Sequence, residues 1–147
     1  MKKIILGLSM MMAIGISSAF ANEELKVNDK VLSSFGKDFT LAKNVQWREE
    51  GGYLKARFTV SDILIEAYYS VDGEFIGSAR NLLFEQLPLS VIREFNQKYD
   101  EASILSVLEI TNIEGTSYRI WLEKDNKKIK LNATSSGEIT VVEKVKK

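Results

Sequence analysis

The sequence contains no histidine, no cysteine and a single proline in 147 residues. Histidine is the common general base and zinc ligand, and cysteine is the thiol nucleophile, so each Ser-His or Cys-His catalytic arrangement is excluded. Without cysteine the chain can form neither disulfides nor a lipoprotein anchor. Phosphate-binding glycine loops, the G-x-G-x-x-G fingerprint and spaced acidic calcium loops are also missing. Chemistry would therefore depend on carboxylates, lysine, tyrosine or serine, and we expect no cofactor and no metal.

The first 21 residues have the order of a secretory signal peptide. Lys2 and Lys3 precede the apolar run IILGLSMMMAIGI, and small residues follow up to Ala21 in an A-x-A arrangement. We expect cleavage after Ala21 and a mature chain, residues 22–147, that is periplasmic or secreted. The alternative is an uncleaved anchor helix. Because the apolar run is short and no later segment reaches about 20 apolar residues, we expect no stable membrane anchor.

The mature chain is nearly neutral and has the length of one domain. Removing Lys2 and Lys3 leaves 18 basic against 20 acidic residues, a formal charge of −2. This balance gives no overall field for nucleic acid, so we expect no nucleic-acid partner. Residues 22–147 are enough chain to bury a core without disulfides, and we expect a single domain with one core.

Hydrophobic periodicity predicts an α+β protein in which a helix and four strands occur twice. The first helix is expected over residues 28–39, with Asn28 as N-cap, and the second over residues 87–99, with Pro88 near its first turn. The expected strands, which read as antiparallel meanders, are 44–47, 53–60, 63–71 and 74–79 in the first half, and 102–111, 117–124, 128–134 and 138–145 in the second.

The two halves, about 22–84 and 85–147, also resemble each other in sequence. At an offset of 60 the helix positions match, as in Phe35 and Phe95. At an offset of 64 the strand positions match, and Gly73-Glu74 aligns with Gly137-Glu138. We interpret this as a tandem duplication that gives two α-β-β-β-β repeats, a curved and mostly antiparallel sheet, and two helices on one face.

Asp72 and Glu74 flank Gly73 and could be read as a catalytic or metal-binding pair of carboxylates. The second half keeps the glycine but replaces Asp72 with Ser136. The two halves therefore share the glycine and the turn that it allows, but not the first carboxylate. Because Asp-Gly favours the positive φ of a two-residue hairpin turn, we expect Asp72 to belong to such a turn and not to a ligand site.

Several segments together resemble a secreted bacterial family described as β-lactamase-inhibitor-like or PepSY-like. They are VQW in the first strand, YYSVDGEFIGSARNL around the hairpin, and LPLSVIREFNQKY at the second helix. The resemblance covers residues 22–147. It implies helices on one face of a continuous curved sheet and a role in binding or restraining another protein, with PepSY modules proposed to restrain proteases.

Alternation along three strands predicts which side chains face away from the helices. Leu54, Ala56, Phe58 and Val60 are expected to point inward, as are Ile63, Ile65, Ala67 and Tyr69, and Tyr118, Ile120 and Leu122. The outward set includes Lys55, Arg57, Tyr68, Arg119 and Trp121, which are our candidates for partner contacts because Tyr, Trp and Arg are enriched at binding hot spots. The alternative is a solvated sheet face held by cross-strand pairs. Trp47 is expected in the core.

Three function classes remain open. The first is an exported, non-enzymatic module that binds a protein or peptide, such as an envelope hydrolase, through the open sheet face. The second is a carrier with an apolar pocket of about 300 Å³ or more between sheet and helices. The third is a carboxylate-based hydrolase, which needs two acidic groups about 5–9.5 Å apart in a cleft. We favour the first class and expect the protein not to be an enzyme.

Overall fold

The computed structural model describes residues 25–146, so the expected signal peptide and its cleavage site lie outside the described residues. In this range the chain is an α+β protein with two α-helices and eight strands. The elements in chain order are α1 (Asp29–Asp38), β1 (Lys43–Glu50), β2 (Tyr53–Val60), β3 (Ile63–Tyr69), β4 (Phe75–Leu82), the 3-10 turn η1 (Phe84–Gln86), α2 (Leu89–Lys98), β5 (Ser103–Asn112), β6 (Gly115–Lys124), β7 (Lys127–Thr134) and β8 (Ile139–Lys146).

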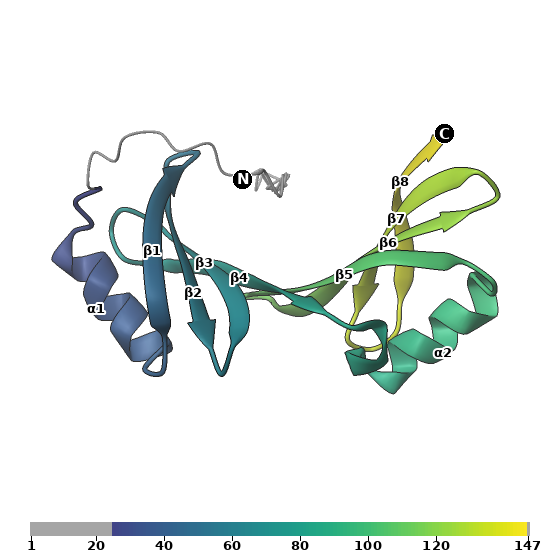
Figure 1. Ribbon diagram of the computed structural model, residues 1–147, viewed down its shortest axis with the longest axis horizontal. Coiled ribbons are helices and arrows are strands. Elements are labelled where there is room, and N and C mark those ends of the chain that lie inside the picture. Colours follow the sequence, from purple (N-terminus) through teal and green to yellow (C-terminus); the bar gives the residue numbers. More distant parts are fainter. Residues whose placement is uncertain (1–24, 147) are drawn as a thin grey trace, which may run out of the picture.

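The eight strands form one antiparallel sheet in the order of the sequence, β1 to β8. Figure 1 shows that the sheet curves. Its two halves rise on either side of the central β4–β5 pair, and both helices lie on the outer, convex side. We call the concave side, which carries no helix, the open face.

Each helix forms where the sequence supplies an N-terminal signal and a pair of apolar residues one turn apart. In α1 the Asn28 side chain accepts a hydrogen bond from the Val31 amide at 3.1 Å, as an N-cap does. Val31 and Phe35 then turn toward the sheet and are buried. Helix α2 begins directly after Pro88, whose fixed φ suits a helix start. The expected N-cap and helix starts are thus confirmed.

Strand register shows that both helices cover the same face of the sheet. One row of paired residues runs Ile65, Arg80, Glu109, Tyr118, Ala133 across five strands. Side chains in such a row share a face. Ile65 packs below α1, whereas Tyr118 and Ala133 pack below α2.

The buried apolar residues form two clusters, one in each half, and not the single core that we expected from chain length. The first cluster joins Val31 and Phe35 to Leu54, Ala56, Phe58, Ala67 and Tyr69. The second joins Leu87, Val91 and Phe95 to Val107, Tyr118, Ile120, Leu122, Ile129, Leu131, Ala133 and Ile139. Between them the helix-side row holds the Arg80–Glu109 ion pair, so charged side chains separate the two clusters.

The inward alternation expected for β2, β3 and β6 agrees with the register at every predicted position. Ile63 pairs with Val60 on the same face but lies at the strand end and is 42% exposed. Trp47 is partly buried and packs against the first cluster, where its ring meets Phe35 edge-on with centroids 5.2 Å apart. Phe35 therefore has an aromatic neighbour on β1 as well as the β2 side chains beneath it.

The Asp72 turn is longer than predicted. Strand β3 ends at Tyr69 and β4 begins at Phe75, so five residues connect them, closed by a hydrogen bond from the Ser70 amide to the Glu74 carbonyl at 2.9 Å. Two-residue turns occur elsewhere, as at Gly51-Gly52, where both φ angles are positive. Asp72 is exposed and lies in a turn, but the turn is not a two-residue one.

The glycine of this turn is fixed by the helix beside it. Gly73 has φ +89°, and an added Cβ would lie 3.0 Å from the Lys30 carbonyl oxygen in the first turn of α1. Gly137 has φ +100°, and its Cβ would lie 2.9 Å from the Ser90 carbonyl oxygen in α2. Only glycine combines this backbone conformation with so close an approach. Each half thus uses a glycine turn to seat the N-terminus of its helix.

Candidate binding face

Three strand pairs place the five predicted site residues on the open face. Lys55 and Arg57 on β2 pair with Tyr68 and Glu66 on β3, and Arg119 pairs with Leu108 on β5. All lie opposite the helix-side rows, so the predicted outward direction of Lys55, Arg57, Tyr68, Arg119 and Trp121 agrees with the register. The structure divides them between two regions, with Lys55, Arg57 and Tyr68 in the first half and Arg119 and Trp121 in the second.

In the first half an aromatic ring, a lysine and a glutamate lie side by side. The Lys55 ammonium stands 5.8 Å from the centre of the Tyr68 ring, within the range of a cation–π contact. The same ammonium forms an ion pair with Glu50 at the end of the edge strand β1. Lys55 is thereby held between the ring and the carboxylate.

The second half repeats this arrangement in reverse order across the sheet. Lys130 on β7 lies 5.6 Å from the centre of the Trp121 ring on β6 and 3.3 Å from the Glu143 carboxylate on the edge strand β8. Both aromatic rings lie toward the centre of the sheet and both glutamates on its outermost strands. The two glutamates and Lys130 were not predicted from the sequence, because pairing across strands is not visible in alternation along one strand.

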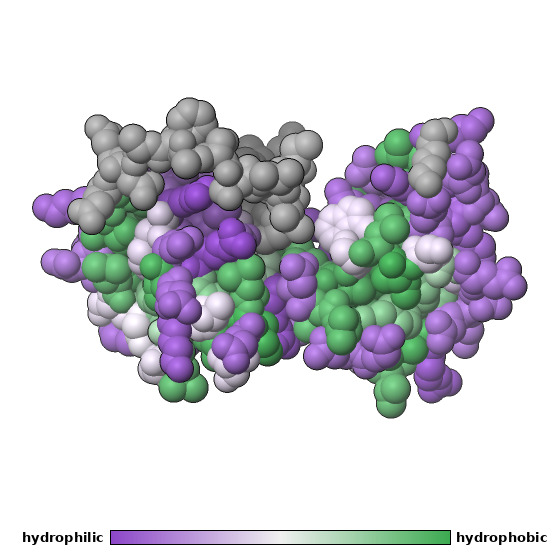
Figure 2. Space-filling model, in the orientation of Figure 1, coloured by the Kyte–Doolittle hydropathy of each residue, from purple (hydrophilic) through white to green (hydrophobic). Residues whose placement is uncertain are grey.

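Between the two rings the open face carries a patch of apolar side chains, with the polar Asn81, Asn112 and Ser117 beside it. The central strands contribute Ala79 from β4 and Leu108 and Ile110 from β5, with Ala79 and Leu108 buried. None of these three belongs to either helix-side cluster. Figure 2 views the molecule from the side and shows, on the β5–β8 half, hydrophilic surface along the outer edge and apolar surface nearer the middle of the molecule. We call Ala79, Leu108 and Ile110 the floor of the open face.

Tyr68 is more enclosed than we predicted. It is 6% exposed, whereas we expected it to stand in water. Its register partner on β4 is Gly77, which adds no side chain to this face and leaves room for the ring. Burial, and then the nearby carboxylates of Glu66 and Glu50, raise the pKa of Tyr68 far above that of a free tyrosine. Its ring therefore contributes to the structure of the face.

Three arginines of the open face, Arg48, Arg57 and Arg119, have no ion pair within residues 25–146. Arg57 is exposed, and its register partner Glu66 forms no ion pair with it. Arg119 is half-buried, and its Nε is fully buried with no hydrogen-bond partner in the same range. A buried donor without an acceptor is costly, because its hydration is lost and not replaced.

The charge of the open face is weakly positive. Register places seven basic and four acidic side chains on it, namely Lys43, Arg48, Lys55, Arg57, Arg119, Lys128 and Lys130 against Glu50, Glu66, Glu123 and Glu143. Two of the four carboxylates, Glu50 and Glu143, already neutralise lysines. The remaining excess of positive charge comes mainly from arginine.

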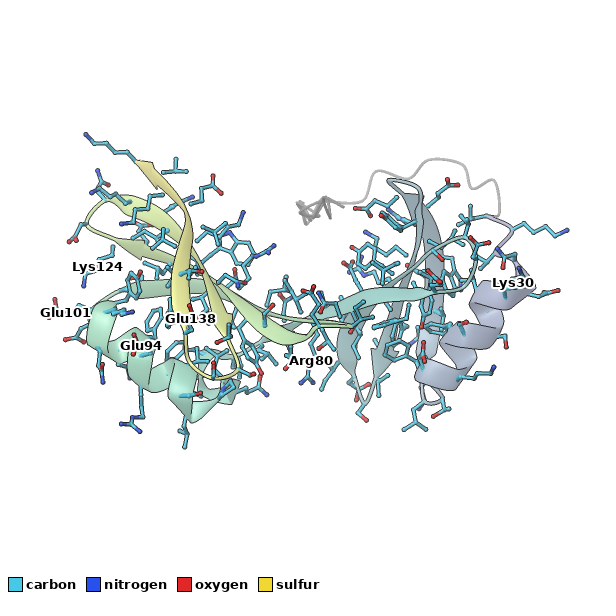
Figure 3. The ribbon with its side chains drawn as sticks, turned by 180° about the vertical axis from the view of Figure 1, so that it is seen from behind. Lys30, Arg80, Glu94, Glu101, Lys124 and Glu138 are labelled. Atoms are coloured by element: carbon cyan, nitrogen blue, oxygen red, sulfur yellow. The ribbon has the colours of Figure 1, made fainter. Side chains whose placement is uncertain are left out.

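The described surface has a depression on each side of the sheet. On the open face a depression of about 40 Å³ is lined by Gln46, Arg48, Lys55, Arg57 and Glu66. On the helix side a depression of about 180 Å³ lies over the β4–β5 centre, where the Arg80 Nε and Glu109 Oε1 are 2.6 Å apart. Figure 3 shows Arg80 at this centre, between the two helix-bearing halves. Each depression contains one carboxylate.

Among the residues that the structure describes, no group of three or more Asp or Glu side chains is arranged to hold a metal ion. No helix in the described part is long and apolar enough to cross a membrane.

Comparison with known proteins identifies the fold. No protein-family model matches the chain, and no curated protein matches it significantly. Solved structures do match. A BLIP-like protein from Bacteroides fragilis is 18% identical, with a TM-score of 0.75 over 85% of this chain and 91% of the other. The chain has a BLIP-like fold.

Two further structures agree with this assignment. A DUF2874 family protein from Bacteroides ovatus is 21% identical, with a TM-score of 0.71 over 82% of this chain and 87% of the other. A protein from Bacteroides eggerthii, provisionally described as periplasmic, is 18% identical, with a TM-score of 0.69 over 82% of this chain and 88% of the other. At these identities the comparison shows the fold alone.

Proposed function

We propose that this protein is an exported, non-enzymatic module that binds a protein or peptide partner through the open face. One observation carries the proposal. An apolar floor is flanked by Tyr68 and Trp121. Beside each ring, toward the edge of the sheet, lies a lysine that forms an ion pair with a glutamate of the edge strand. Protein interfaces have this anatomy, with an apolar and aromatic centre inside a polar rim.

Two similarities support a binding role. The fold is like that of a BLIP-like protein, and the sequence resembles β-lactamase-inhibitor-like and PepSY-like proteins. By this analogy an envelope hydrolase is a suitable class of partner. Export is supported by the A-x-A order before Ala21 and by the periplasmic description of one structural relative.

The two alternative functions find less support in the geometry. A hydrolase needs two carboxylates facing one cleft, and each of the two depressions contains one. A carrier needs an apolar pocket of about 300 Å³ or more. The helix-side depression is smaller, at about 180 Å³, and the Arg80–Glu109 ion pair lies in its lining.

We also propose that the fold arose by duplication of a unit with one helix and four strands. The glycine turns support this interpretation. Gly73 approaches Lys30 as Gly137 approaches Ser90, and these residues are equivalent at the two offsets found in the sequence. The inverted order of the Lys–aromatic pairs does not follow the repeat, so it must have been acquired separately in each half.

Site-directed photo-crosslinking tests the binding role. A photoreactive phenylalanine analogue is placed at Ser106, which pairs with Trp121 on the open face, or at Trp121 itself. Matched controls carry it at Lys37 on α1 and Gln97 on α2, which are exposed on the opposite side. In the native envelope fraction we expect the same discrete protein adduct from both open-face positions and none from the helix positions. Adducts from the helix positions alone would contradict the proposed function.

A further inference from the structure

The arginines of the open face differ from two of its lysines in what they contact. Lys55 and Lys130 each pair with a glutamate of this face and lie beside an aromatic ring. Arg57 and Arg119 have neither contact among residues 25–146. The charges of Lys55 and Lys130 are therefore paired within the molecule, whereas those of the two arginines have no ion pair among the described residues.

Arg119 is placed to act on something that lies against the floor. It pairs with Leu108 of the floor on one side and with Asn132 on the other, and it is two residues from Trp121 on the same strand. Its Nε is enclosed and lacks an acceptor among the described residues. A guanidinium held in this way is matched by a carboxylate, which accepts two parallel hydrogen bonds from it.

The first half offers a second position for negative charge. The open-face depression is lined by three basic side chains, Arg48, Arg57 and Lys55, and by Gln46 and one carboxylate, Glu66. Neither arginine forms an ion pair within residues 25–146, so the lining keeps an excess of positive charge. The floor lies between this depression and Arg119 in the strand order. An occupant that satisfies both positions must therefore carry apolar atoms in its middle and negative charge on its flanks.

We infer that the partner presents a projecting loop in which an apolar tip, set on the floor between Tyr68 and Trp121, is flanked by acidic side chains that pair with Arg119 and with Arg57. This rests on the proposed function and specifies its partner. Nucleic acid fits less well, because a phosphate backbone has no apolar group for the floor and the chain as a whole has a formal charge of zero.

A library of random disulfide-closed loops displayed on phage tests the inference even while the natural partner is unidentified. Loops are selected on the immobilised mature protein, and those that lose binding to a Trp121→Ser variant are kept as open-face binders. We expect these loops to combine Asp or Glu with aromatic or aliphatic residues well above their frequency in the unselected library.

The selected loops are then measured against charge variants. Arg57→Glu and Arg119→Gln are each expected to weaken binding by about tenfold or more, as the loss of a charge-assisted hydrogen bond implies. The control is Arg93→Glu on α2, an exposed arginine without an ion pair among the described residues, which changes net charge as Arg57→Glu does. It should leave binding unchanged. Thermal unfolding of each variant verifies that the fold is kept, and Arg119→Lys provides a milder variant if Arg119→Gln is unstable.

The Nε–H signal of Arg119 in a nitrogen–proton NMR spectrum gives a second readout. We expect it to shift when a selected loop is added and to stay in place when its Asp and Glu residues are changed to Asn and Gln. Open-face loops without an excess of acidic residues would overturn the inference and leave the proposed function standing. Equal competition by oligo-dT would also overturn it, as the mark of a general anion site. Failure to select any open-face loop would contradict the proposed function itself.

Discussion

Tyr68 and Trp121 occupy matching places on the open face but differ in burial, and this difference separates stability from binding. Tyr68 is 6% exposed, whereas Trp121 is half-buried. Trp121→Ser should therefore leave the melting temperature nearly unchanged and reduce recovery of the envelope partner, by about 2 kcal/mol or more if Trp121 is a hot spot. Tyr68→Ser should instead lower the melting temperature. The reverse order, measured by thermal unfolding beside affinity capture, would contradict this division.

The Tyr69 phenol makes stability depend on pH at the alkaline end. It is fully buried and donates a hydrogen bond to Asp38 Oδ2 at 2.8 Å. Burial, then this hydrogen bond and the Asp38 charge, raise the pKa of Tyr69 well above its usual value of 10.0. The native state thus holds the proton more tightly than the unfolded state, so the contribution to stability is present below about pH 10 and is lost as the pH rises further.

Tyr69→Phe tests this linkage. At pH 8 the variant should be less stable by about 1 kcal/mol, because it lacks the hydrogen bond to Asp38. Between about pH 10 and 11 its melting temperature should fall less steeply than that of the wild type, since the unfolded state no longer gains an ionised phenol at this position. Parallel pH profiles for the two proteins would show that this phenol is not linked to folding.

Gly73 and Gly137 should be sensitive to substitution because each has a positive φ and lies against a helix carbonyl, whereas the Asp72 side chain is exposed. Gly73→Ala and Gly137→Ala must accept a positive φ and move a helix carbonyl, so we expect each to cost about 2 kcal/mol or more. The control is Gly51→Ala, where φ is also positive but nothing lies within 4 Å of the added Cβ, at about 1 kcal/mol. Asp72→Ser should leave the melting temperature unchanged. Equal losses at Gly73 and Gly51 would mean that the helix can shift.

At the scale of elements, each helix depends on one phenylalanine. Phe35 contacts the rings of Phe39, Trp47, Phe58 and Tyr69, and Phe95 contacts those of Phe84 and Tyr99. Either residue changed to Ala should cost about 3–5 kcal/mol. Because the two clusters are separate, hydrogen exchange in Phe95→Ala should rise first in β6 and β7 while β2 and β3 stay protected. A uniform rise across all strands would show that the halves unfold as one unit.

The strand directions could be predicted wherever apolar and polar residues alternate, as along residues 53–60. They could not be predicted for β4 and β8. In β4 the helix side carries Ser78 and Arg80 while Ala79 faces the floor, which inverts the usual polarity. In β8 a register shift after Val141 changes the side on which the later residues lie. Both features depend on neighbouring strands and so are not visible in local alternation.

At the scale of the whole molecule, the fold class followed from the sequence, whereas the division into two clusters did not. Composition and length indicate how much apolar surface can be buried, but the curvature of the sheet decides whether the helices meet over one core. Here the helix-side centre is held by Arg80 and Glu109, and no local pattern indicates that these two residues, 29 positions apart, form an ion pair. Alternation alone also placed Tyr68 in solvent, because it does not show that the neighbouring residue on β4 is Gly77, which leaves room for the ring.

Export remains a prediction about residues outside the described range. Mature protein recovered from the envelope or the medium should have an intact mass that corresponds to a chain beginning at Asn22. The matched control is a variant with Ala19 and Ala21 changed to bulky residues, which should keep the full-length mass and stay with the membrane fraction. A chain beginning at Met1 in the cytoplasm would contradict the prediction.

The order of the strands in the sheet has a consequence for how the chain acquires its structure. Every strand pairs with its neighbours in sequence, and the one longer connection within residues 25–146, between β4 and β5, contains only η1 and α2. Each hairpin can therefore form as soon as its own residues leave the ribosome or a translocation pore, without waiting for a distant segment. Such low contact order favours rapid folding for a protein rich in strands. It also shortens the time in which unpaired strand edges are open to aggregation.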